Sequence, residues 1–315
     1  MKKQTNFVVD ILASRESAIF LALIIIVIFI GVQAPHFLSS NNLYLVSRQI
    51  SFVTIVALGE LFVILSAGID LSVGSIIGLS GVMAGIAMAA GLPVLIALPL
   101  GVLTGLLVGV LNGVLVAYVG ITPFIVTLGM LSMARGVIWV LTKGNPITEI
   151  PESFFFIAQG DFLGIPAPVI IAAILAVIVH IVLTYTAFGR RVFAIGGNEE
   201  ATALSGIDVK KIKLLIYGIC GIMCSFVGII LIARFYSAQP ATGDGWELDA
   251  IAAAVIGGTS LMGGVGSVLG VIIGATIMGV IRNGLVLLKV SVYWQQLVIG
   301  SIIVLAAVID RLKNK

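Results

Sequence analysis

The chain has 315 residues, of which 60% are hydrophobic and only 10% are charged. A soluble domain carries about 25% charged residues, so this composition excludes a soluble globular protein. The apolar runs are continuous over about the thickness of a bilayer, whereas the strands of a membrane barrel alternate over about ten residues. The sequence therefore predicts an all-α polytopic membrane protein. Its formal net charge of +3 says little about partners, and we expect membrane lipid but no nucleic acid among them.

The amino-terminal segment places basic residues before the first apolar run, as a signal peptide would. No small-residue cleavage site follows that run, which ends at residues 32–36. We therefore expect an uncleaved first crossing.

Ten crossings fit the hydrophobic pattern. They lie near residues 18–34, 46–66, 70–90, 93–119, 122–143, 168–188, 213–236, 246–262, 266–288 and 292–310. The third, fifth and eighth are short or interrupted by Gly or Pro, so we expect broken or re-entrant helices among them; such backbone is tolerated at membrane depth only where it is buried or lines a cavity. No loop exceeds about 25 residues, far below the size of a domain, so residues 1–315 form a single transmembrane domain.

The basic residues predict the orientation. Eleven of the 17 Lys and Arg residues fall near the two termini or in the loop 189–213. The positive-inside rule places these eleven in the cytoplasm, and an even number of crossings places both termini there. They are Lys2, Lys3, Arg15, Arg190, Arg191, Lys210, Lys211, Lys213, Arg311, Lys313 and Lys315.

Glycine recurs every four residues in two of the predicted crossings. This spacing leaves one helix face without side chains, so another backbone can approach closely. One interpretation is tight packing within a subunit; the other is a helix that slides or lines a transport path. The residues are Gly101, Gly105, Gly109 and Gly113 in the fourth crossing and Gly266, Gly270 and Gly274 in the ninth.

Two stretches share a spacing that suggests an internal repeat. Asn112 is followed by Gly129 at the same interval at which Asn283 is followed by Gly300. In the predicted topology these stretches cross the membrane in opposite directions, as in the inverted repeats of transporters. The alternative is chance similarity in a chain rich in glycine and valine.

Five charged residues lie in or at the rims of the crossings: Glu60, Asp70, Arg135, Glu247 and Asp249. A charge at the bilayer centre costs about 2.5–3.5 kcal/mol on insertion scales, so each should pair, face a cavity or lie near an interface. The segment 68–75 reads as a tight turn followed by a helix start. Asp70 could accept hydrogen bonds from the free N–H groups of that turn, or it could line a polar path.

Motifs for catalysis and metal binding are missing from the sequence. There is no G-x-x-x-x-G-K-[ST] phosphate loop, no H-E-x-x-H and no G-x-S-x-G. Cys220 and Cys224 lie four residues apart on one helix face, and we expect neither a disulfide nor a metal site there. The chain is therefore predicted not to be an enzyme and to bind no cofactor itself.

The loop 189–213 is the only long polar and basic insertion between the apolar runs. Glu200 and Ala201 lie shortly before Gly206, which matches the E-A-A-x-x-x-G element in the cytoplasmic loop of ABC importer permeases, with Thr202 in place of the second Ala. A short helix with small residues and a Gly at its end can fit a groove on a partner; the alternative is a merely solvated loop. The predicted ATPase-docking residues are Arg190, Arg191, Glu199, Glu200, Ala201 and Gly206.

Four ordered stretches resemble the permease subunits of monosaccharide ABC importers, the ribose-type permease most of all. They are residues 67–75 (AGIDLSVGS), 122–129 (TPFIVTLG), 196–207 with the polar insertion (GGNEE and SGI), and 257–266 (GGTSLMGGVG). The resemblance implies a multi-pass permease of the bacterial plasma (inner) membrane with a type II importer fold, similar to the vitamin B12 permease. It also implies a second copy of the permease, an ABC ATPase subunit that uses ATP and Mg, and an extracytoplasmic sugar-binding protein.

Ribose is neutral and polar, so hydroxyl and amide groups would suit its passage. The candidates for the translocation path are Asp70, Ser72, Asn112, Thr127 and Asn283. Two other functions stay open at this point: an ion-coupled secondary sugar transporter, and a membrane enzyme or scaffold that acts on lipid.

Overall fold

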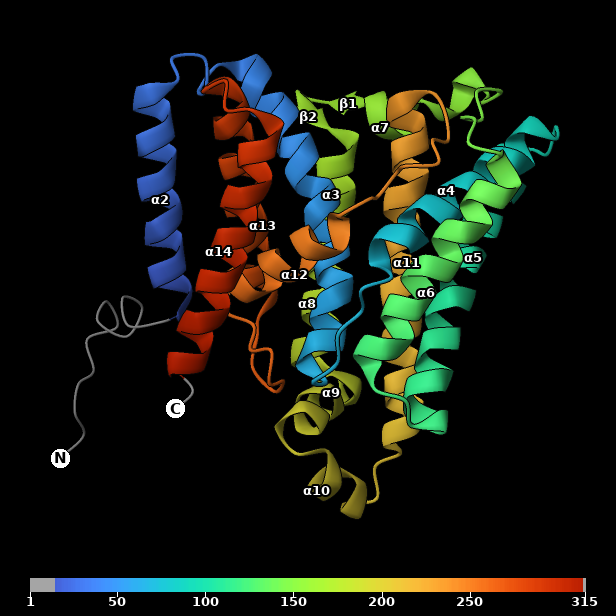
Figure 1. Ribbon diagram of the computed structural model, residues 1–315, viewed down its shortest axis with the longest axis vertical. Coiled ribbons are helices and arrows are strands. Elements are labelled where there is room, and N and C mark those ends of the chain that lie inside the picture. The colour runs from blue at the N-terminus through green and yellow to red at the C-terminus, as the bar shows by residue number, and fades with distance from the viewer. Residues whose placement is uncertain (1–14, 314–315) are drawn as a thin grey trace.

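The computed structural model describes residues 15–313, so Lys2, Lys3 and Lys315 lie outside the described residues. Within this range, ten helices lie where the ten crossings are predicted (Figure 1). They are α2 (Arg15–Gln33), α3 (Ser40–Leu65), α4 (Val73–Ala89), α5 (Val94–Val114), α6 (Pro123–Thr142), α8 (Ala167–Tyr185), α11 (Val209–Phe235), α12 (Trp246–Ile256), α13 (Val268–Leu287) and α14 (Val292–Lys313).

Seven of the described helices are long and apolar enough to cross a membrane. α4 has 17 residues and α12 only 11, which confirms the expectation of short third and eighth crossings. The same expectation was wrong for the fifth crossing, because α6 runs unbroken for 20 residues. Its Pro123 lies in the first turn, where the missing N–H would have had no helical partner.

The helices form two halves with the same packing pattern. α3 packs on α13 as α11 packs on α5, and α4 packs on α5 and α6 as α12 packs on α13 and α14. Corresponding helices run in opposite directions: α3 descends toward the end of the molecule that carries α10, and α11 rises from it (Figure 1). The chain therefore has an inverted repeat in which α3–α6 are matched by α11–α14, as the Asn and Gly spacing indicates.

α3 and α11 lie at the centre of the molecule and are largely buried, and α5 packs closely against α11. The glycine stripe of α5 makes this approach possible. A Cβ at Gly105 would overlap the carbonyl oxygen of Gly221 and Oγ of Ser225, and one at Gly109 would overlap the carbonyl oxygen of Tyr217. In α13 the stripe faces a different neighbour, since Gly274 lies against the backbone of Ala253 in α12. The packing interpretation of both stripes is thus confirmed.

The two ends of the helix bundle carry different structures (Figure 1). At one end the segment 144–167 contains the short helices η2 (Glu152–Phe154) and α7 (Phe156–Gln159) and a two-stranded antiparallel hairpin of β1 (Asp161–Phe162) and β2 (Ile165–Pro166). At the other end α9 (Ala187–Gly197) and α10 (Glu199–Leu204) protrude from the bundle. The first residue of α2 and the last of α14 lie toward the same end as α10.

Candidate functional site

α9 and α10 make up most of the polar insertion, and local sequence explains their limits. Thr186 caps α9 by accepting the N–H of Gly189 at 3.2 Å, and Asn198 caps α10 by accepting the N–H of Ala201 at 2.8 Å. Gly206 follows α10 with φ +82°, a conformation that costs an L residue strain. The predicted short helix ended by Gly206 is therefore present.

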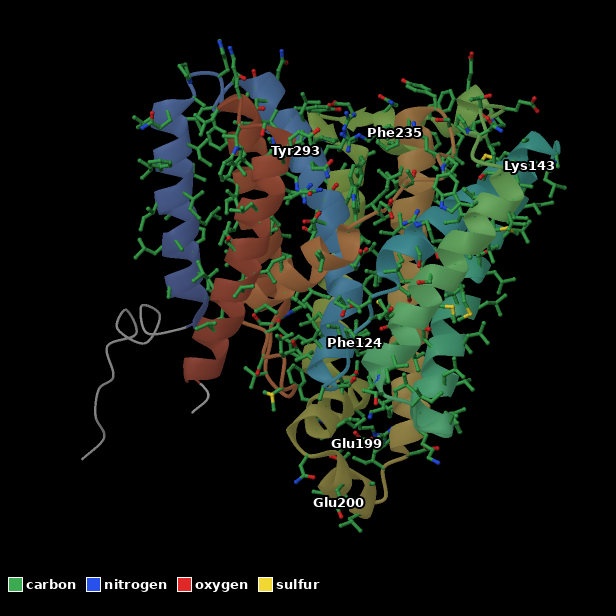
Figure 2. All side chains as sticks on the ribbon, in the orientation of Figure 1. Phe124, Lys143, Glu199, Glu200, Phe235 and Tyr293 are labelled. Atoms are coloured by element: carbon green, nitrogen blue, oxygen red, sulfur yellow. The ribbon has the colours of Figure 1, made fainter. Side chains whose placement is uncertain are left out.

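The residues predicted for docking gather at this end of the molecule, and all six are exposed. Glu199 and Glu200 lie on the protruding helix (Figure 2). Glu199 pairs with Lys213 of α11 at 2.6 Å, which ties the start of α10 to the bundle. The sequence pattern missed Leu204, whose side chain is 84% exposed at the end of α10, although an apolar residue in a polar segment was a visible signal.

A cavity of about 850 Å³ separates α10 from the connection between α5 and α6. That connection contains the π-helical turn η1 (Leu115–Val119) and then Gly120 with φ +84°. Glu200 and Lys210 line the other side of the cavity. α10 is therefore held mainly through α9 and α11, and it has free space on its α6 side.

The four stretches that resemble sugar permeases are in contact, each with the next, in the folded molecule. The N–H of Gly264 donates to the carbonyl oxygen of Leu65 at 2.9 Å. A Cβ at Gly263 would lie 2.9 Å from both Cβ of Ala67 and Cα of Gly196. Residues 67–75, the end of α9 and the loop after α12 thus meet at a joint too tight for side chains at its glycines.

A second contact connects the remaining stretch to this joint. The hydroxyl of Thr127 in α6 donates a hydrogen bond of 3.4 Å to the carbonyl oxygen of Ile69. The end of α9 is therefore in direct contact with the segments that follow α3 and that lead into α4 and α13.

Three of the predicted path residues form a buried polar network at the start of α4, in which only Oδ1 of Asn112 lacks a hydrogen-bond partner. Oδ1 of Asp70 accepts both the N–H and the hydroxyl of Ser72, at 2.8 and 2.6 Å. Nδ2 of Asn112 donates to Oγ of Ser72 at 2.8 Å, and the N–H of Asp70 donates to Oε1 of Glu60 at 3.0 Å. All four side chains are fully buried. The turn-capping alternative for Asp70 is thus present, and these contacts favour a scaffolding role.

Two substitutions separate scaffolding from a path role at Asp70. Asp70→Asn keeps an oxygen that can accept both bonds from Ser72, so we expect near-normal melting temperature and transport. Asp70→Leu leaves these buried donors unpaired, and we expect it to lower the free energy of unfolding by about 3 kcal/mol. Thermal melts in detergent and sugar uptake check both variants. Loss of uptake by the Asn variant at normal melting temperature would instead assign the carboxylate to the path.

Asn283 does not join this network. Its side-chain amide exchanges hydrogen bonds of 3.0 and 2.9 Å with that of Asn42, at the start of α3. Asn283 corresponds to Asn112 in the inverted repeat, so the two lie in opposite halves of the molecule.

Two of the remaining charges in the crossings, Arg135 and Asp249, pair with partners far along the chain. Arg135 of α6 donates to the carbonyl oxygens of Pro240 and Thr242 at 2.9 and 3.0 Å and pairs with Asp244 at 3.1 Å. Arg282 of α13 donates to both oxygens of Asp249. An isolated charge in an apolar run indicates that a partner of opposite charge or a hydrogen-bond acceptor lies nearby. The spacing of residues in the sequence does not show which residue that partner is. Across residues 15–313 no group of His, Cys, Asp and Glu could hold a metal ion.

Two inverted halves of apolar helices and a protruding polar helix pair together define a membrane transport permease. Residues 42–307 match the family described as branched-chain amino acid transport system/permease component, and the chain belongs to this family. It is a permease component of an ABC transport system and not the ATPase. This membership decides against a secondary transporter and against an enzyme that acts on lipid.

Several relatives align over nearly the whole chain. The ribose import permease protein RbsC of Bacillus subtilis (strain 168) is 44% identical over 297 residues, which cover 94% of this chain and 92% of the relative. RbsC of Escherichia coli (strain K12) is 43% identical over 303 residues, covering 95% and 94%. The D-allose transport system permease protein AlsC of the same strain is 40% identical over 315 residues, covering 100% and 96%. No solved structure matches the chain significantly.

Proposed function

We propose that this chain carries ribose across a bacterial plasma membrane, as the permease of an ATP-driven importer. The single observation that supports ribose is the likeness to ribose import permeases at 44% and 43% identity over more than nine-tenths of the chain. Allose, named for the relative at 40% identity, is the second candidate. The permease acts with a second copy of itself and with an extracytoplasmic protein that captures the sugar.

The ATPase docks on α9 and α10. The exposed small residues and the exposed side chain of Leu204 support this assignment, because an apolar side chain held out in water is suited to a pocket on a partner. Arg190, Arg191, Glu199 and Glu200 set the register of the contact by charge. ATP and Mg are bound by the ATPase, and this chain holds neither.

The docking site faces the cytoplasm. Lys210, Lys211 and Lys213 adjoin α10, and the positive-inside rule assigns such a basic segment to the cytoplasmic side. Both ends of the chain then lie in the cytoplasm, since α2 begins and α14 ends toward α10. The loop 144–167 faces the binding protein.

The mechanism is a two-state gate. Closure of the ATPase pair on ATP moves α10, which has free space beside the α5–α6 connection. α9 passes the movement to the glycine joint with residues 65–67 and 263–264 and so to the starts of α4 and α13. The loaded binding protein triggers this cycle only if it prefers one of the two states.

Uptake by cells tests the substrate. Cells that express the permease with its ATPase and binding protein receive labelled ribose, allose or leucine. We expect ribose to accumulate in preference to allose and leucine, and only when the binding protein is present. Preferential leucine uptake would show that the substrate belongs to the branched-chain amino acids named in the family description. Preferential allose uptake would show that the substrate is allose and not ribose.

A further inference from the structure

The chain between α11 and α12 is irregular and reaches membrane depth. α12 has 11 residues, or about 16 Å, and its carboxyl end leads into the glycine joint near α9. Because the hydrocarbon core is about 30 Å thick, α12 starts near its middle, and Figure 1 shows this start at mid-height. Backbone of this kind must be buried in protein or line a water-filled cavity.

The side chain of Asp244 shows that the end of this segment lines water and is not buried in protein. It lies directly before α12 and is 72% exposed, while its partner Arg135 is 13% exposed. An exposed carboxylate at this depth faces water and not lipid, because lipid would not solvate it. The surface that carries Asp244 is therefore aqueous.

A cavity of about 400 Å³ opens beside Asp244, between α12, α13 and α14. It is of the size that holds small polar ligands. The ion pair of Asp249 and Arg282 lies on its wall, and the side chain of Arg282 is 42% exposed. Trp246 and the exposed amide of Gln296 complete the polar and aromatic lining.

This lining suits an uncharged polyol. Asp249 pairs with Arg282, and Asp244 on the same wall pairs with Arg135, so the wall offers paired donors and acceptors without a net charge to hold an ion. An indole face and an amide add contacts for C–H and O–H groups. The fully buried network of Asp70, Ser72 and Asn112 offers no such opening.

We propose that this cavity is a transit site for a neutral sugar, with Trp246, Asp249, Arg282 and Gln296 as the residues that contact its hydroxyl groups. The proposal rests on the proposed function, since it takes the cargo to be a sugar. The path then runs along the face of the molecule formed by α12 and α14, in the half of the membrane farther from α10.

Cysteine labelling tests the aqueous character of the site. The native Cys220 and Cys224 are both buried, so background reaction with a charged thiol reagent is low. Gln296→Cys is compared with Ile25→Cys, whose parent side chain is 59% exposed midway along α2, at the edge of the bundle. We expect Gln296→Cys to react about 100-fold faster, because a thiolate is disfavoured in hydrocarbon. Equal rates would overturn the proposal.

Reconstituted transport tests the sugar contact. The complex of permease, ATPase and binding protein is assembled with Gln296→Leu, and ribose uptake is measured beside ATP hydrolysis. We expect uptake to fall about fivefold, the effect of one lost hydrogen bond, with unchanged ATP hydrolysis. Unchanged uptake would overturn the proposal. If the wild-type complex itself moves no sugar while Gln296→Cys is still labelled, the proposed function fails and the aqueous site stands.

Discussion

Gly206→Trp is expected to abolish association with the ATPase while the helix bundle stays folded. A Cβ at Gly206 meets no atom within 4 Å, so the indole ring has room and projects into the proposed docking surface. The backbone there has φ +82°, so the variant carries strain of about 1–2 kcal/mol in one exposed turn. We expect affinity for the ATPase to fall at least about 100-fold, as for disruption of an interface centre.

Gly91→Trp is the matched control for this variant. Gly91 has φ +83° and also meets nothing within 4 Å, but it follows α4 at the other end of the bundle. Both variants carry the same strain and the same added bulk, and only Gly206→Trp blocks the proposed surface. Co-purification with the ATPase checks the pair. Normal co-purification of Gly206→Trp, or equal loss in both variants, would remove α10 from the docking site.

Gly105→Leu is expected to prevent α5 from packing on α11. The added carbons would overlap Oγ of Ser225 and the carbonyl oxygen of Gly221, and the carbonyl belongs to the helical backbone and cannot move aside. Overpacking costs about 1–3 kcal/mol where side chains can adjust, and we expect more than about 3 kcal/mol here because two backbones must separate. The variant should therefore give little folded protein and a strongly lowered melting temperature in detergent.

Gly129→Leu controls for the effect of a leucine in place of a helical glycine. Gly129 lies in α6 and a Cβ there meets no atom within 4 Å. We expect this variant to keep the wild-type melting temperature or to raise it slightly, since glycine weakens a helix interior. Similar melting temperatures for Gly105→Leu and Gly129→Leu would show that the glycine stripe does not set the approach of the two helices.

The crossings could be predicted from the sequence because each is a run of apolar residues whose signal is local. The same holds for α10, where Asn198 and Gly206 mark the two ends by capping and by backbone conformation. The prediction of a short or broken fifth crossing was wrong because a proline in the sequence indicates a helix break unless it is known to lie in the first helical turn.

Contacts between distant residues could not be predicted. Arg135 binds carbonyl oxygens more than 100 residues away, and Asn283 pairs with Asn42 across 241 residues. Asn112 and Asn283 are both candidates for the path, but the structure places them in opposite halves of the molecule, with different partners. Burial could not be predicted either: Asp70 and Asn112 are polar, yet both are fully buried and hydrogen-bonded to Ser72, and their place in the path stays a prediction.

The four stretches that resemble sugar permeases lie in contact with one another beside the end of α9. Each supplies a part of one chain of contacts that runs from α9 through Leu65 and Gly264 to Ile69 and Thr127. Glycine is needed where backbones cross without room for a side chain, as at Gly196 and Gly263. The four stretches that carry the resemblance therefore lie together in the folded molecule, although they are far apart in the sequence.

The most direct test of the account is ribose uptake into proteoliposomes that contain the permease, its ATPase and the loaded binding protein. We predict uptake that requires ATP on the α10 side, stops with a hydrolysis-deficient ATPase and persists when proton and sodium gradients are collapsed by ionophores. Uptake by the permease alone, lost on collapse of an ion gradient, would contradict the account.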